Sequence, residues 1–173
     1  RDILSRIIYG ARISLTVGVL SILLGVIIGG AFGLVAGYKG GWVDNTIMRV
    51  MDVFMSFPTL IMGLLIVAVL GASLTNLIVA IALTVAPRFA RIARAPTVTV
   101  KERDFVEAGR AMGFSDIRIM VVHILPNILP ALIVISLLEM GATLMLLGEL
   151  GFVGVFMGGG TRQESLFLVS ATI

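Results

Sequence analysis

Two long stretches of this 173-residue chain contain no charged residue. The first covers the 24 residues Ile13–Ala36, and the second covers the 35 residues Val53–Pro87. A helix needs about 20 apolar residues to cross the roughly 30 Å hydrocarbon core of a bilayer. Only 13% of the chain is charged and 58% is hydrophobic, whereas about a quarter of a soluble domain is charged. The pattern predicts an all-α polytopic protein, a transmembrane helical bundle whose solvent is largely lipid.

The longer stretch predicts two membrane spans rather than one. A single helix of its 35 residues would be about 52 Å long at 1.5 Å per residue, more than the hydrocarbon core requires. Residues 71–76 include Gly, Ser and Asn, which suit a turn. We therefore expect spans at Val53–Leu70 and Leu74–Ile92. Ile124–Gly148 predicts a fourth span, and an apolar run from Leu166 predicts the start of a fifth.

Glycines recur at every fourth position along the first span and just beyond it, at Gly25, Gly29, Gly33 and Gly37. This spacing places them along one face of a helix. Small residues on such a face let a second helix approach closely. We expect the face to pack against another helix, although glycine is also common in membrane helices generally.

The basic residues are unevenly distributed. Seven of the 13 lie at the end of the third span or between it and the fourth, and these are Arg88, Arg91, Arg94, Lys101, Arg103, Arg110 and Arg118. Cytoplasmic loops carry the excess of Lys and Arg, so we expect residues 88–123 to face the cytoplasm and residues 71–76 to face outside. Arg88 and Arg91 would then lie at the end of the third span and extend their charged groups to the membrane surface. Asp44 and Asp52 are expected to pair with Arg49 or with a partner.

A short amphipathic helix is predicted within the cytoplasmic segment. Phe105, Ala108 and Met112 recur at helical spacing with charged residues between them. Gly113 predicts the end of this helix. The apolar residues have no core of their own to enter, so they would fit a groove on a partner. The alternative is that the helix lies on the membrane surface, and this segment alone does not decide between the two.

A second short helix is predicted after the glycine. Ser115 is a suitable cap for a helix over Asp116–Leu125. Pro126 predicts its end, because proline has no N–H to continue the helical hydrogen bonds.

The same segment resembles a known transport signature. Glu107-Ala108-Gly109, then Gly113, then Ile124-Leu125-Pro126, is similar in order and spacing to the EAA signature of ABC importer permeases, with Gly109 in place of a second Ala. Further segments resemble the dipeptide, oligopeptide and nickel branch of that family, namely Arg1–Arg6, Tyr9–Leu15, Ala36–Tyr38, Gly41–Asp44, Phe57-Pro58, Arg103–Ala108 and His123–Asn127. The resemblance covers nearly the whole chain.

The resemblance implies a coupling role for the EAA-like helix. In the family this helix is a coupling helix that docks into an ATPase subunit. The ATPase-coupling residues would be Phe105, Glu107, Ala108, Gly109, Arg110, Met112 and Gly113. The resemblance also implies one transmembrane permease domain over residues 1–173, a fragment without the family's first span and most of its last.

The resemblance further implies partners, location and function. ABC ATPase subunits, a second permease subunit (a homologue or a copy of this chain) and an extracytoplasmic substrate-binding protein would assemble with it. The complex would lie in a bacterial or archaeal cell (inner) membrane, in contact with lipid and with no nucleic acid. The expected function is to form the translocation path of an importer for dipeptides, oligopeptides or nickel, and to couple that path to ATP hydrolysis.

Glu139 is the one charged residue of the fourth span, where a carboxylate is costly unless it faces protein or water. It would line the translocation path, or hydrogen-bond as a neutral acid to a neighbouring helix. His123, the only histidine, is expected to be packed rather than a metal ligand, because no metal-ligand spacing accompanies it. No nucleophile–base pair or phosphate-binding loop is present. We therefore expect a non-catalytic subunit without metal or cofactor, with ATP hydrolysis in partner chains.

Two other classes of function stay open on the sequence. An ATP-independent secondary transporter or channel subunit would need ion- or proton-coordinating groups inside the membrane, and only Glu139 lies deep in a predicted span. A membrane scaffold would use the cytoplasmic segment to bind a protein that is not an ATPase. Co-purification of an ATPase would separate these alternatives from a permease.

Overall fold

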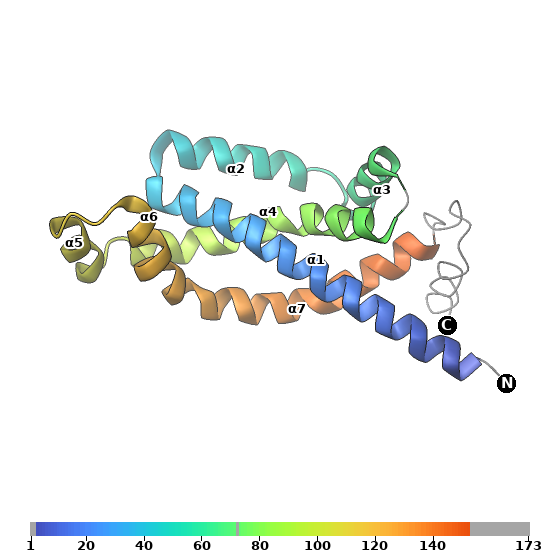
Figure 1. Ribbon diagram of the computed structural model, residues 1–173. Helices are drawn as coiled ribbons and strands as arrows, with labels where there is room; N and C mark the ends of the chain where they lie inside the picture. The colour runs from blue at the N-terminus through green and yellow to red at the C-terminus, as the bar shows by residue number, and fades with distance from the viewer. Residues whose placement is uncertain (1–2, 72, 153–173) are drawn as a thin grey trace.

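The structure, a computed structural model, describes residues 3–71 and 73–152. These residues form helices and no strand, which confirms the all-α prediction for the part they cover. Figure 1 shows α1, α4 and α7 side by side, with α2 along them and α5 at one end. The elements are α1 Ile3–Lys39, α2 Gly41–Met55, α3 Thr59–Leu70, α4 Leu74–Val100, α5 Asp104–Ala111, α6 Asp116–Arg118, the π-helical turn η1 Ile119–Ile124 and α7 Leu125–Phe152.

Three of the described helical segments are long and apolar enough to cross a membrane. They are Ala11–Lys39 of α1, Leu74–Val100 (α4), and Asp116–Leu150, which runs through α6, η1 and α7. α2 and α3 qualify only together, as a pair bent by 93°. The predicted span Val53–Leu70 is therefore wrong as a single helix. α2 ends at Met55, and Pro58 directly precedes α3 with φ −54° and ψ 134°. Because proline has no N–H and disfavours helical geometry in the residue before it, the helix is interrupted there.

The third predicted span is longer than expected. α4 runs to Val100 rather than Ile92, through two internal prolines. Arg88 and Arg91 thus lie within the helix and not at its end, which corrects the sequence-based expectation. Each of them has an acidic partner on a neighbouring helix, so neither has to extend to the membrane surface to be neutralised.

The turn between α3 and α4 lies where the sequence predicted it. Gly71 has a φ of +89°, a left-handed conformation that glycine adopts without steric cost. The Ser73 hydroxyl accepts the backbone N–H of Asn76 at 3.1 Å and caps α4. The Asn76 side chain donates to the carbonyl of Leu70 at 2.6 Å. Side chains of the turn therefore bind both helix ends.

The predicted glycine face of α1 packs against α4. A Cβ at Gly29 would overlap the carbonyl oxygen of Ala86, and one at Gly33 would overlap the carbonyl oxygen of Ala90. The other two glycines of this face also lie against the α4 backbone or its side chains. The two helices approach so closely here that only glycine fits at these two positions, which confirms the prediction.

The second cytoplasmic helix does not end before Pro126, and this prediction is wrong. α6, η1 and α7 follow one another directly and together form one continuous candidate span, Asp116–Leu150. The N–H of Leu125 bonds to the carbonyl of Met120, five residues back, which is the π-helical register. The register widens immediately before the proline, so its missing N–H does not end the helix. The fifth span expected from Leu166 lies outside the described residues.

We expect Thr75 to be accessible from outside the cell and Glu102 from inside. Both residues are exposed, at opposite ends of α4, and the chain has no other thiol. Cysteines placed singly at these positions should therefore react differently with a membrane-impermeant maleimide. In intact cells only Thr75→Cys should be labelled, and permeabilised cells, as the control, should show both. Labelling of Glu102→Cys alone in intact cells would invert the predicted orientation.

Candidate functional site

α5 presents the apolar face that the sequence predicted. Asp104 and Glu107 lie in its first turn and Arg110 in its last. At these positions each charge interacts favourably with the helix dipole. Phe105 is 43% exposed and Met112, directly after the helix, is 65% exposed. Ala108 is exposed on the same helix. The described part of the chain therefore leaves these three predicted coupling residues uncovered.

The opposite face of α5 packs against the bundle, a contact that was not predicted from the sequence. Val106 is fully buried in the same hydrophobic cluster as Ile119, Ile124 and Phe89 of α4. Gly109, one of the predicted coupling residues, is also buried. The spacing of Val106 and Gly109, three residues apart, was the available signal for this second face. The contact fixes the orientation of α5 on the bundle.

Gly113 ends α5 as predicted, with a φ of +78°. The Gly113 N–H bonds to the carbonyl of Arg110 at 2.9 Å, and the Phe114 N–H bonds to the carbonyl of Gly109 at 3.1 Å. This pair of bonds is a Schellman motif, in which a glycine in left-handed conformation terminates the helix. The Phe114 ring packs over Gly109. The next helix then begins at its predicted cap, Ser115, whose hydroxyl accepts the N–H of Arg118.

Polar contacts join the α5–α6 region to the end of α1. The Tyr38 hydroxyl donates to Asp116 at 2.8 Å, and Lys39 forms an ion pair with the same carboxylate. The guanidinium of Arg110 lies 5.3 Å from the centre of the Tyr38 ring, a cation–π arrangement. His123 stacks on Phe114 at 5.8 Å, in agreement with the prediction of a packed histidine. Among these contacts, the one between Arg110 and Tyr38 joins α5 directly to α1, and the bonds to Asp116 join α6 to α1.

A second candidate region surrounds Glu139. Both carboxylate oxygens of Glu139 accept from the Nη1 of Arg88, at 2.8 and 2.6 Å. Glu139 is thus bonded to a neighbouring helix, as the second alternative expected, but through an ion pair with Arg88 of α4. The Arg88 side chain is 47% exposed and that of Glu139 is 14% exposed. Because a charge facing lipid is costly, the exposed side of this pair is expected to face water or protein.

Arg88 is the first of three α4 arginines that pair with acids on other helices. Arg91 pairs with Asp52 of α2, and Arg94 binds Asp44 of α2 through two hydrogen bonds of 2.5 Å. The expectation that these two aspartates pair with Arg49 or with a partner is therefore wrong. α4 is joined ionically to α2 on one side and to α7 on the other.

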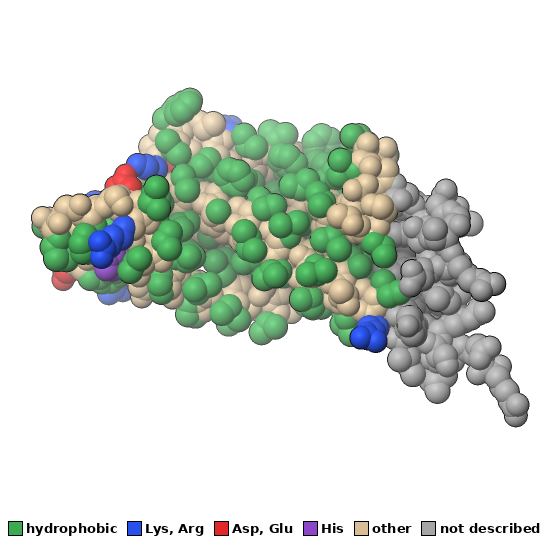
Figure 2. Space-filling view, viewed as in Figure 1, with side chains coloured by type: hydrophobic (Ala, Val, Ile, Leu, Met, Phe, Trp, Pro, Cys, Tyr) green, Lys and Arg blue, Asp and Glu red, His purple; other side chains and the backbone are tan. Residues whose placement is uncertain are grey.

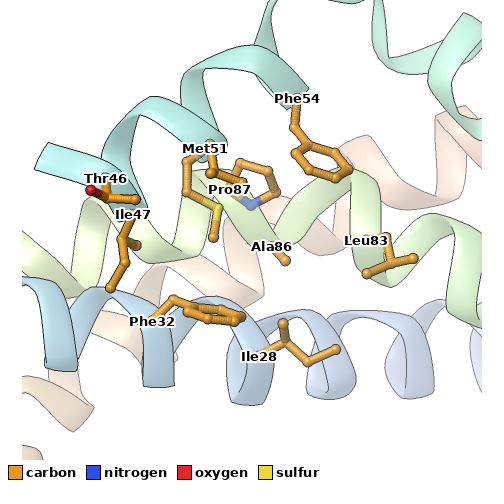
Figure 3. A pocket seen from close by; sticks show the side chains of 10 residues that line it. Ile28, Phe32, Thr46, Ile47, Met51, Phe54, Leu83, Ala86 and Pro87 are labelled. Carbon is orange, nitrogen blue, oxygen red and sulfur yellow. The ribbon is translucent and has the colours of Figure 1, made fainter. Parts of the chain in front are cut away.

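The Arg88–Glu139 pair lies in a groove of about 210 Å³ between α3, α4 and α7. We call this the α4–α7 groove. Its polar lining residues are Thr59, Thr84, Arg88, Glu139, Thr143 and Glu149. A larger pocket of about 310 Å³ between α1, α2 and α4 is different in character (Figure 3). Residues such as Phe32, Met51 and Phe54 line it, and among the described lining residues only Thr46 has a polar side chain. The pocket between α1, α2 and α4 therefore suits apolar groups, whereas the α4–α7 groove suits charged ones.

Comparisons with known proteins agree with these features. The model of the family described as "Binding-protein-dependent transport system inner membrane component" matches residues 21–165. The chain is 39% identical to the glutathione transport system permease protein GsiD of Pectobacterium atrosepticum, over 90% of this chain and 52% of that protein. It is 41% identical to the dipeptide transport system permease protein DppC of Alkalihalophilus pseudofirmus, over 90% of this chain and 51% of that protein. The chain thus spans about half the length of these curated relatives.

The fold is also found among solved structures. A chain of the MetNI methionine ABC transporter, in an inward facing conformation, superposes with a TM-score of 0.72. The superposition covers 99% of this chain and 90% of that chain, at 21% sequence identity. At this identity the similarity establishes the shared fold alone, a helical bundle of the ABC transporter permease type.

Proposed function

Because the chain belongs to the family of binding-protein-dependent transport system inner membrane components, we propose that it is the permease subunit of an ATP-binding-cassette importer. The family resemblance inferred from the sequence is confirmed, and the chain is a multi-pass inner membrane protein. In the proposed role, it forms part of the translocation path and α5 docks into a separate ATPase subunit. The structural observation that supports the coupling role is the uncovered apolar face of α5.

Three features of α5 favour docking into a protein over lying on a membrane surface. The helix has eight residues. Its exposed apolar side chains are Phe105, Ala108 and Ala111, with Met112 directly after it, a small area for anchoring to lipid. In Figure 2, hydrophobic side chains cover the middle of the visible face, whereas charged ones gather mainly at the end with α5. α5 is also fixed through its other face, so a force applied to it reaches α1, α4 and α7. A short rigid helix of this kind fits a groove on a partner.

The remaining parts of the proposal follow from family membership. A second permease subunit, or a copy of this chain, would complete the path, ATPase subunits would bind at α5, and an extracytoplasmic binding protein would deliver the substrate. The two relatives are named for glutathione and dipeptide transport, so we assign a peptide-class substrate here. Glu139 and Arg88 would face the path. The family description, a binding-protein-dependent system, disfavours both the ATP-independent transporter and the scaffold.

Replacing Phe105 or Met112 with Asp is expected to detach the ATPase. Each substitution, Phe105→Asp or Met112→Asp, removes an apolar anchor worth about 1.5–3 kcal/mol if buried at an interface, so ATPase affinity should fall at least tenfold. The measurement is ATPase co-purification with the full-length subunit and its partners, together with dipeptide uptake in proteoliposomes. Phe105→Leu and Met112→Leu are the matched controls and should retain both activities. Unchanged co-purification in the Asp variants would instead support a membrane-surface helix.

A further inference from the structure

The α4–α7 groove has an unbalanced charge. Its described lining contains one guanidinium, on Arg88, and two carboxylates, on Glu139 and Glu149. Both oxygens of Glu139 are already engaged by Arg88, so these two charges neutralise each other. Glu149 is exposed in the same groove and forms no ion pair with any described residue. One negative charge is therefore left for a group that enters the groove.

Unused hydrogen-bond acceptors accompany this charge. Thr143 is 1% exposed, lines the groove and has a hydroxyl with no hydrogen-bond partner among the described residues. A buried polar group without a partner is costly, so a rotation of the Thr143 side chain toward a donor in the groove would be favourable. The exposed Thr59 hydroxyl lines the same groove from α3. The groove thus combines a free carboxylate with hydroxyl oxygens from two helices.

We propose that the α4–α7 groove is a transit subsite for the ammonium group of an amino-terminated, peptide-like substrate. An ammonium group carries one positive charge and three N–H donors and accepts no hydrogen bond, which complements the Glu149 carboxylate and the Thr143 and Thr59 hydroxyls. A carboxylate would be repelled by Glu149, because the one cation among the described lining residues, Arg88, is already neutralised. The inference rests on the proposed permease function and specifies which end of the substrate the path recognises.

The test compares thiol reagents of opposite charge at Thr59→Cys. The variant is made in the full-length chain, which then has one thiol in the described segment, and is assembled with its partners in membrane vesicles. The reagents are trimethylammonium-ethyl and sulfonatoethyl methanethiosulfonate, and their rates are normalised to those at Thr75→Cys outside the groove. The cationic reagent should react about tenfold faster, a factor equivalent to about 1.4 kcal/mol. Glu149→Gln should abolish this preference, whereas Glu102→Gln, at the far end of α4, should not.

A second arm uses substrate protection. Saturating alanyl-alanine should slow the cationic reagent at Thr59→Cys, and N-acetyl-alanyl-alanine, which lacks the ammonium group, should not. Equal normalised rates for the two reagents, or a preference that survives Glu149→Gln, would overturn the proposal. Absence of any reaction at both Thr59→Cys and a second lining position, Ala142→Cys, would show that the groove is closed to solutes and would also overturn it. None of these readouts requires ATP, so failure of ATPase coupling is distinguished from failure of this subsite.

Discussion

Gly29→Ala is expected to destabilise the helical bundle by about 3 kcal/mol, in the upper part of the range for overpacked interiors. The added Cβ would overlap the carbonyl oxygen of Ala86 and lie 2.8 Å from the Cβ of Phe89. The first of these is a backbone atom of α4, so no rotation of a side chain can relieve the overlap. α1 and α4 would have to move apart, and the close packing between the glycine face and α4 would be lost.

Gly30→Ala is the matched control, because it adds the same methyl group to the same helix. At Gly30 the nearest atom to the new Cβ is a methyl carbon of Leu132 at 3.6 Å, an ordinary van der Waals distance. Alanine is also the better helix former by about 1 kcal/mol, so this variant should be neutral or slightly stabilised. The measurement is thermal unfolding of both variants in detergent. Equal stabilities would mean that the close approach of α1 and α4 does not exist.

Asp44→Asn is expected to cost about 3 kcal/mol of stability, the lower end of the range for breaking a buried ion pair. Asp44 is 8% exposed, and both its oxygens accept hydrogen bonds from Arg94. An asparagine offers one acceptor oxygen and no charge, so Arg94 would keep a partly buried, uncompensated positive charge. The partial exposure of Arg94, whose side chain is 38% accessible, is the reason for choosing the lower end.

Asp52→Asn supplies the comparison, since Asp52 pairs with Arg91 between the same two helices. Both side chains of this pair are about half exposed, Asp52 at 52% and Arg91 at 53%, and exposed pairs contribute at most about 1 kcal/mol. Denaturant or thermal unfolding of the two variants should therefore separate them clearly. If Asp52→Asn proved as damaging as Asp44→Asn, burial would not be what makes the Asp44–Arg94 pair important.

The features that sequence reasoning predicted well are local. The glycine face of α1 follows from a four-residue period, the end of α5 follows from Gly113, and the turn at residues 71–76 follows from its composition. Each depends on residues that lie close together in the chain. Their conformational preferences are strong enough that the surrounding structure does not override them.

The contacts that were missed depend on partners far along the chain. The α4 arginines were predicted to mark the end of a span, because the acidic residues that pair with them lie 39 to 51 residues away in the sequence. The bend before α3 was hidden within a charge-free stretch, because hydropathy reports apolar length and not the direction of the helix. For the candidate site, the outward face of α5 was predicted, whereas its buried face and the contacts of Tyr38 and Asp116 required knowledge of the neighbouring helices.

The arginine pairs of α4 have a consequence for how the protein is made. During synthesis the acids that neutralise Arg91 and Arg94 emerge before α4 does, 39 and 50 residues earlier. Glu139 emerges 51 residues after Arg88. A single arginine at the centre of a membrane helix costs about 2.5–3.5 kcal/mol in insertion by the translocon. We therefore expect two of the three charges of α4 to be neutralised as the helix emerges, and the third only when α7 follows.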